Sequence, residues 1–295
     1  MGAPGDLATF TDQRAHLLGV AYRLTGSWAD AEDAVQDAWL RWDRLDAGDR
    51  AAVREPRAWL TTTVARLCLD RVRSAPARRE QYVGPWLPEP LVASGPDDVL
   101  DAVVAGHEVR MAAMLVLERL SPDQRVALVL HDATGVDFAA IGEVLGCPAA
   151  TARQHASRAR RIVAAAAAEG ALPEAAPATE QRRVLDAFVT ALATGDVPAL
   201  VGVLHPGAVL RSDGGGVVRA ARRPVLGADK VARLLVALGE QAGAEALATV
   251  RPVQVNGEAG LLLPGPAPIV LTLTVADGRA MAVHLPMNPE RLRVP

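Results

Sequence analysis

The pattern of hydrophobic positions predicts three helices in the first part of the chain. In each helix an apolar residue recurs every three or four positions, which places an apolar stripe on one face. The stripes are Leu17, Val20, Ala21 and Leu24, then Ala31, Ala34, Val35, Ala38 and Trp42, then Leu60, Val64, Leu67 and Cys68. Gly26 suits a helix end, Ser27 suits a helix cap and Pro56 suits a helix start. We therefore predict a helical unit over residues 6–74.

A second helical unit is predicted over residues 97–168. Ser121 is a good N-cap because Pro122 follows it and Gln124 lies three positions later. Asp137 can cap a short helix over residues 138–145, whose apolar residues have helical spacing. This helix ends at Gly146-Cys147-Pro148, where glycine suits the left-handed end of one helix and proline the first turn of the next. The pattern predicts a helix-turn-helix.

The helix predicted after this turn carries four arginines between Cys147 and Arg161 and no acidic residue. Its small residues would let it lie close to a phosphate-lined groove, as recognition helices do. Arginine can read guanine, glutamine can read adenine, and further arginines can bind phosphate. The predicted base contacts are Thr151, Arg153, Gln154 and Arg158, and the predicted phosphate contacts are Arg160 and Arg161. The alternative is a basic amphipathic helix that only faces solvent.

Two linkers separate the predicted folded units. Residues 75–96 contain five prolines, which predict an extended linker, and residues 169–178 have linker composition. The first linker carries aromatic residues and leucines between Tyr82 and Leu91, and such residues usually need a surface to cover. That surface is either an adjacent domain of the same chain or a partner.

The last part of the chain, residues 179–295, predicts an α+β domain. Helical spacing at Val184, Leu185, Phe188 and Leu192 comes first. Runs rich in β-branched residues and leucine follow at residues 246–255, 260–263 and 269–275. Asp277-Gly278 then favours a hairpin turn into a strand over residues 280–285.

Composition narrows the class of protein. The 295 residues carry a net charge of −3, so a surface for nucleic acid must be local. Residues 1–50 hold nine acids and five arginines, whereas residues 54–79 hold seven arginines and two acids, which predicts separate surfaces for protein and for phosphate. The two cysteines lack metal-ligand or disulfide spacing. With no long apolar stretch or signal pattern, we expect a cytoplasmic protein without membrane, metal or cofactor.

With both helical units described, the chain resembles the sigma-70 family, in particular its extracytoplasmic-function members, which keep regions two and four. Residues 21–37, with the motif DAEDAVQ, are similar to region 2.2, which binds the polymerase clamp. Pro56-Arg57-Ala58-Trp59-Leu60, with Asp70 and Arg73, is similar to the helix that meets the minus-ten promoter element. Residues 120–161 are similar to region four. The resemblance implies two partners, core RNA polymerase and promoter DNA.

The resemblance also assigns residues in the first unit. The implied polymerase-binding residues are Asp30, Glu32, Asp33, Gln36 and Asp37, and the alternative for this acidic stripe is a solvated helix face. The candidates for promoter melting are Arg57, Trp59, Thr62, Arg66 and Arg73, since stacking and backbone charge can hold an unpaired base. Trp59 is left open between this role and core packing.

Three further segments are similar to signatures of the subgroup with a C-terminal SnoaL-like domain. They are Tyr82 to Leu91, then Asp213, Gly214, Gly215 and Gly216, and then Asn288, Pro289, Glu290, Arg291 and Leu292. The resemblance implies two all-α sigma domains followed by a cone-shaped α+β domain that regulates them in cis, with these residues as regulatory contacts. Val217 departs from the pattern, because a basic residue commonly follows the glycines.

Two other classes of function stay open. SnoaL-like folds also house cyclases and isomerases, and His205, Asp213, Asp229 and His284 are the candidate acid and base groups. No paired carboxylates or metal-ligand spacing support such an enzyme. The third class is a helix-turn-helix regulator with a ligand-binding domain, and a small ligand of the C-terminal domain is left open. The interpretation adopted is a sigma factor that catalyses no reaction itself.

Overall fold

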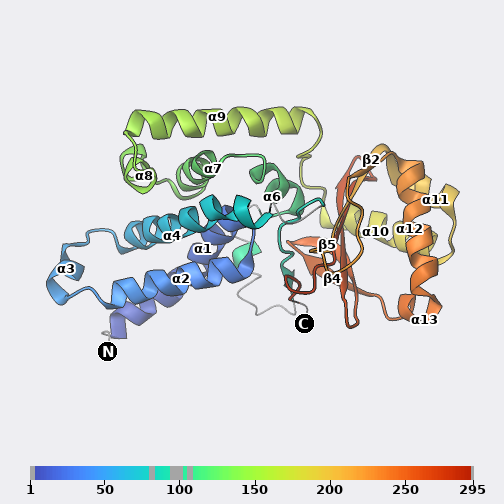
Figure 1. Cartoon of the computed structure of the whole chain (residues 1–295), viewed down its shortest axis with the longest axis horizontal. Helices are drawn as coiled ribbons and strands as arrows, with labels where there is room; N and C mark the ends of the chain where they lie inside the picture. The colour runs from blue at the N-terminus through green and yellow to red at the C-terminus, as the bar shows by residue number, and fades with distance from the viewer. Residues whose placement is uncertain (1–3, 80–83, 94–101, 105–108, 294–295) are drawn as a thin grey trace. The chain divides into compact units, whose positions relative to one another are not determined.

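The structure, a computed structural model, describes residues 4–79, 84–93, 102–104 and 109–293 (Figure 1). They form two compact units. The first unit draws on residues 1–80, 99–109 and 113–172, and the second on residues 81–98, 110–112 and 173–295. Within the described residues, no helix is both long and apolar enough to cross a membrane.

The first unit begins with a helical bundle. Its helices are α1 (Pro4–Thr25), α2 (Trp28–Asp43), α3 (Ala47–Ala52) and α4 (Pro56–Arg79). Gly26 ends α1 with a left-handed φ of 67°, and the Ser27 side chain caps α2 by accepting from the Asp30 amide. The predicted apolar stripes of α1 and α2 are buried. The predicted stripe of α4 is buried too, except for Leu67, which is half-buried. The three main helices and their punctuation were correctly predicted.

Helix α4 runs past the end that was predicted for it at residue 74. It continues through Pro76 to Arg79, so this boundary was wrong. Proline removes one backbone donor and crowds the carbonyl four residues earlier. The helix nevertheless includes Pro76 and ends three residues later, at Arg79.

The same unit continues with a second group of helices. They are α6 (Met111–Leu117), α7 (Pro122–Leu128), the π-helical turn η1 (Val129–Ala133), α8 (Phe138–Leu145) and α9 (Ala149–Ala168). Ser121 and Gln124 form the predicted capping box, and Asp137 accepts from the amides of residues 139 and 140. Gly146 is left-handed, with φ of 70°. The helix-turn-helix was correctly predicted, whereas the π-helical turn was not.

Buried polar contacts join the two groups of helices in the first unit. Helix α4 packs against α7 and α8. The Arg125 side chain, 4% exposed, donates to the carbonyl of Leu24 at 3.0 Å and to Glu118 at 2.9 Å. Because a buried guanidinium must be paired, these bonds fix the end of α1 against α7.

The second unit is an α+β domain. Its helices are α10 (Ala178–Ala193), α11 (Val197–Val203), α12 (Ala228–Ala242) and α13 (Ala244–Leu247). Its strands are β1 (Val92–Ala93), β2 (Leu204–Asp213), β3 (Val225–Leu226), β4 (Arg251–Val255), β5 (Glu258–Leu263), β6 (Ile269–Ala276) and β7 (Arg279–Pro286). Among the described residues they form one seven-stranded sheet in the order β1-β4-β5-β6-β7-β2-β3.

The pairing is antiparallel except between β2 and β7, which run parallel. Asp277 and Gly278 form the predicted hairpin turn, with φ of 51° and 70°. The strand predicted over residues 246–255 was only half right. Its first residues belong to α13, because alanine and leucine favour a helix, and β4 starts at Arg251.

Helices α10, α11 and α12 lie on one side of the sheet (Figure 1). The space between them and the sheet is filled by a large apolar core. Its largest members include Phe188, Leu200, Leu204, Leu210, Val231, Leu235, Leu273 and Leu285. A smaller cluster of Val92, Val255, Leu262, Val270 and Leu292 is separate from this core. The predicted fold class, two helical domains followed by an α+β domain, is confirmed.

Candidate functional site

Helix α9, the predicted recognition helix, packs through a narrow stripe of small residues. The stripe is Ala152, Ala156, Ala159 and Ala166, all fully buried. Alanines allow close packing on α7 and α8, which leaves the longer side chains to other faces. Gln154, Arg158 and Arg161 are exposed and Thr151 is half-buried. Arg158 and Arg161 make no ion pair with any described residue.

Arg153 and Arg160 lie two helical turns apart on one flank of α9, and each contacts the preceding elements. The guanidinium carbon of Arg153 lies 5.2 Å from the ring centroid of Phe138 on α8. Arg160 donates through two nitrogens to the carboxylate of Asp132 in η1, with Nε 2.9 Å from Oδ2. This hydrogen bond raises the pKa of Arg160. Of the two arginines predicted to bind phosphate, Arg160 is thus paired within the chain.

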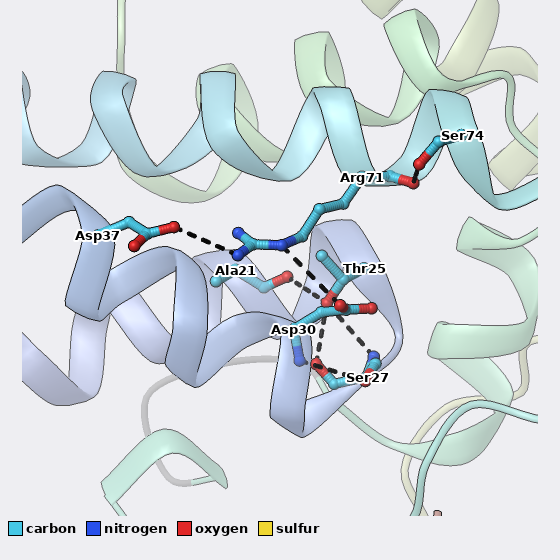
Figure 2. A network of polar contacts seen from close by, with 7 residues as sticks. All are labelled: Ala21, Thr25, Ser27, Asp30, Asp37, Arg71 and Ser74. Atoms are coloured by element: carbon cyan, nitrogen blue, oxygen red, sulfur yellow. Dashed lines mark hydrogen bonds and ion pairs between the residues drawn. The ribbon is translucent and has the colours of Figure 1, made fainter.

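The acidic stripe of α2 is partly tied to neighbouring helices. Figure 2 shows Arg71 of α4 reaching toward two of its members, 3.9 Å from Asp30 and 3.4 Å from Asp37. Glu32 lies 3.9 Å from Arg14. Two more predicted members, Asp33 and Gln36, are exposed, and Asp33 has no ion pair among the described residues.

Hydrogen bonds around the α1–α2 turn fix where this stripe begins (Figure 2). The hydroxyl of Thr25 lies 2.9 Å from the Ala21 carbonyl and 3.0 Å from the Ser27 carbonyl. It also accepts from the Ser27 amide at 3.3 Å, and the Ser27 hydroxyl accepts from the Asp30 amide. Because Asp30 lies in the first turn of α2, its charge also interacts favourably with the helix dipole.

Helix α4 presents the predicted melting residues on two faces. Trp59, Thr62, Arg66 and Arg73 follow one another at spacings of three, four and seven, so they share a face. Arg57 lies apart from them, with Nη2 3.3 Å from His16 Nδ1. The structure therefore does not bring all five residues together.

Three members of this α4 face already contact other helices. The half-buried ring of Trp59 packs edge-on against Trp42, with centroids 5.3 Å apart. Arg66 lies 3.7 Å from Glu143 of α8, and Arg73 lies 2.8 Å from Asp123 of α7. Two arginines predicted to face DNA are therefore paired with carboxylates of the helix-turn-helix group.

In the second unit, Asp213 at the end of β2 joins two distant segments. It is 2% exposed, and its Oδ2 accepts from the Leu87 amide while Oδ1 accepts from the Gly215 amide, both at 2.9 Å. Arg291 Nη1 lies 3.5 Å from Asp213 Oδ2 and donates to the Leu87 carbonyl at 2.9 Å. Its guanidinium carbon is 3.9 Å from the ring centroid of Trp86. The apolar part of the first linker thus packs on the α+β domain; Tyr82 and Val83 lie outside the described residues.

The glycines and Asn288 fit together closely. Gly215 has φ of 61°, and a Cβ there would lie 2.1 Å from Cγ of Asn288. A Cβ at Gly214 would lie 2.0 Å from the Val218 carbonyl oxygen. Asn288 Oδ1 accepts from the amide of Glu290 and thereby shapes the turn that leads to Arg291. In the rest of the predicted set, Gly216 and Glu290 are exposed, Pro289 is half-buried and Leu292 is buried.

One contact of the linker was missed from the sequence. The Leu91 amide donates to Asn256 Oδ1 at 3.0 Å, and the Asn256 amide donates to the Leu91 carbonyl at 2.9 Å. Strand β1 follows and pairs with β4, with Val92 opposite Val255. The dipeptide Asn256-Gly257, a hairpin signal, was the available clue to this edge.

The candidate acid and base groups of the second unit are not gathered at one place. His205 and Asp213 lie at opposite ends of β2, and Asp229 is exposed on α12 and paired with Arg233 at 2.9 Å. His284 is buried on β7, 3.2 Å from the Thr274 hydroxyl, and burial lowers its pKa to about 3. The described residues contain no group of three side chains suited to a metal ion.

Comparison with known proteins covers nearly the whole chain. Residues 10–78 match the family model of sigma-70 region 2, and residues 110–163 match that of sigma-70 region 4. The chain is 46% identical to the ECF RNA polymerase sigma factor SigJ of Mycobacterium tuberculosis (strain H37Rv), over 97% of this chain and 93% of SigJ. A probable ECF RNA polymerase sigma factor of the same species, SigI, is 34% identical over 97% and 94%. The crystal structure of SigJ superposes with a TM-score of 0.79, covering 97% of each chain.

Proposed function

This chain belongs to the extracytoplasmic-function (ECF) RNA polymerase sigma factors, and we propose which of its surfaces bind polymerase, bind DNA and regulate both. A sigma factor binds core RNA polymerase and directs it to promoters. We assign this function to residues 6–74 and 97–168, and regulation to the linker 75–96 and residues 179–295. The proposed place of action is the cytoplasm, where core polymerase acts.

The proposed polymerase-binding surface is the acidic face of α2. Asp33 and Gln36 are its exposed members, while Arg71 and Arg14 hold Asp30, Asp37 and Glu32. A fixed acidic surface favours a basic partner, because complementary charges speed encounter and select register. Asp33 is the member that we expect to contribute most, since no cation among the described residues pairs with it.

The proposed reader of the minus-thirty-five element is α9. Gln154, Arg158 and Arg161 project from its exposed face, and Arg153 and Thr151 lie beside them. Bidentate contacts of arginine with guanine and of glutamine with adenine would give discrimination, and Arg161 would bind phosphate. Arg160 can join these contacts only if it leaves Asp132.

The proposed contact with the minus-ten element is the α4 face of Trp59, Thr62, Arg66 and Arg73, whereas Arg57 lies on another face of α4 and would need a separate contact. Arg66 and Arg73 would exchange Glu143 and Asp123 for phosphates. Both ion pairs are largely exposed, so their loss costs little, about 0–1 kcal/mol each. Binding of DNA therefore competes directly with the contacts between α4 and the helix-turn-helix group.

Regulation in cis is proposed to act through the linker. The observation that carries it is the bonding of Leu87 and Trp86 by Asp213 and Arg291, since this segment connects the two DNA-binding groups. Asn288 and the glycines hold Asp213 and Arg291 in place. A domain that holds the linker limits the separations that the two DNA-binding groups can adopt.

We propose no catalytic role for the α+β domain, because its candidate acid and base groups are dispersed. In addition, apolar side chains fill the space between the sheet and helices α10, α11 and α12. A small ligand would therefore need a site other than this interior. The alternative function, a helix-turn-helix regulator with a ligand domain, predicts DNA binding without polymerase.

Transcription in vitro with purified core polymerase tests the proposed function. The promoter is first selected from a random-sequence library by the reconstituted holoenzyme. We expect specific initiation that requires both the chain and the core enzyme. Specific binding of the selected DNA by the chain alone, with no effect on initiation, would support the regulator instead.

A further inference from the structure

The π-helical turn η1 (Val129–Ala133) interrupts the helix that leads into the helix-turn-helix. π-helical turns are rare, and they are frequent at functional sites. Two consecutive residues of this turn make the contacts: Asp132 binds Arg160 of α9, and His131 stacks on Phe138 of α8, which in turn contacts Arg153 of α9. The turn therefore connects to the recognition helix at two separate points.

The first connection is a row of three side chains. The ring of His131 stacks on that of Phe138, with centroids 4.1 Å apart and planes at 27°. His131 Nδ1 lies 3.0 Å from the Val136 carbonyl, which can only accept, so this nitrogen carries the hydrogen and the ring is fixed. The guanidinium of Arg153 lies over the same Phe138 ring, a cation–π contact. His131 thus fixes the Phe138 ring, and this ring in turn positions the Arg153 side chain.

The second connection is the two-point ion pair between Asp132 and Arg160. Parallel N–H···O bonds are the most directional pairing that arginine makes. Both side chains are partly exposed, 45% for Arg160 and 36% for Asp132, so DNA can reach this pair. While it lasts, the charge of Arg160 is neutralised.

We propose that His131 and Asp132 are positioning residues for the recognition helix. They do not contact bases themselves, but they determine the orientation of Arg153 and the availability of Arg160. Asp132 withdraws Arg160 from phosphate and so weakens binding to all DNA alike. His131, through Phe138, restricts Arg153 to the orientation from which it reads a base. Together the two residues increase the preference for the promoter over other sequences, while the affinity for DNA of any sequence is lowered. This inference rests on the proposed role of α9 in reading DNA.

The test uses holoenzyme, assembled with core polymerase, and two duplexes, the selected promoter and a scrambled version. Asp132→Ala should bind both duplexes more tightly and steepen the dependence of log affinity on log salt concentration by about one phosphate contact. The double variant Asp132→Ala/Arg160→Ala should lose this gain. Asp229→Ala, which removes one acid and frees one arginine far from α9 in sequence, is the matched control and should leave both quantities unchanged.

His131→Ala should reduce the preference for the promoter by about two- to fivefold without changing the salt dependence, because a partly exposed cation–π contact is weak. His131→Phe keeps the stack and should restore the preference. An unchanged salt dependence in Asp132→Ala, or a gain that survives loss of Arg160, would overturn the inference for Asp132. Equal preference in His131→Ala and wild type would overturn it for His131. If wild-type holoenzyme itself did not distinguish the two duplexes, the proposed function would fail instead.

Discussion

The guanidinium of Arg291 lies 3.9 Å from the ring of Trp86, and the same side chain donates to the Leu87 carbonyl, 204 residues earlier in the chain. Trp86 and Leu87 belong to the linker between the two DNA-binding groups, whereas Arg291 lies near the end of the α+β domain. One side chain thus connects the α+β domain to the segment that joins those two groups.

Replacing Arg291 by Ala should release this part of the linker. Asp213, almost fully buried, would lose its cation, and the Leu87 carbonyl would lose its donor, at a cost of about 1–3 kcal/mol. Hydrogen exchange of the Leu87 amide should accelerate accordingly. Arg233→Ala is the control, because Arg233 is 68% exposed and pairs with Asp229 of its own helix, α12, rather than with the linker. Equal protection of Leu87 in both variants would argue against the role of Arg291.

Replacing Arg153 or Arg158 by Ala should cost about 1–3 kcal/mol at the cognate minus-thirty-five element and relax the base preference there. Arg161→Ala should instead weaken binding to every sequence and lower the salt dependence by about one contact. Binding of promoter variants by holoenzyme measures both effects. A uniform loss in the first two variants would show that they contact only phosphate.

Reversing charge on α2 should weaken assembly with core polymerase. Asp33→Arg replaces an exposed acid that has no ion pair within the described part of the chain. Asp37→Arg also removes an acid, and it places a cation beside Arg71. Because charge attraction is screened, the deficit should shrink as salt rises. Co-purification with core at two salt concentrations measures this, with Asp49→Arg of α3 as the control. If Asp33→Arg assembled like wild type, α2 would lie outside the interface.

Shortening the chain should separate two contributions to regulation. Ending it before Asn288 removes Arg291 and Leu292 but keeps most of the sheet, whereas ending it near Ala178 removes the α+β domain. We expect different promoter output from the two, measured by transcription in vitro. Asp213→Ala should also alter output without altering which minus-thirty-five sequence is preferred. If all three matched the full chain, the α+β domain would have another role.

His284 should make unfolding sensitive to mild acid. Its pKa is lowered to about 3 by burial, from a usual value of 6.5, so the folded protein keeps it neutral while the unfolded chain protonates it. The free energy of unfolding should therefore fall as pH drops below about 6.5, by up to ~1.4 kcal/mol per pH unit, until the folded pKa is reached. Urea unfolding of His284→Gln between pH 7 and 5 should therefore depend less on pH than unfolding of the wild type.

Local chemistry explains what could be predicted from the sequence. Caps such as Ser121 and Asp137 and the left-handed Gly146 act on their own neighbours, so they indicated the helix-turn-helix directly. Two other features depend on residues that are far apart in the sequence. They are the parallel pairing of β2 with β7 and the hydrogen bond from the Leu87 amide to Asp213. The sequence therefore did not decide whether the apolar residues of the linker cover a domain of the same chain or a partner. The π-helical turn was missed because no residue type specifies it. The pairing of Arg160 with Asp132 was missed because the two residues lie 28 positions apart and meet only in the folded unit.

The pairing of Val92 with Val255 also has a consequence for synthesis on the ribosome. Both DNA-binding groups and β1 emerge before β4, the strand that β1 joins. At about 5–20 residues per second, roughly 10–30 s pass between translation of the two strands. In the later part of that interval, after translation has passed Ala168, the nascent chain carries both DNA-binding groups before β4 is available to pair with β1. The proposed restraint of the linker therefore begins only as translation nears its end.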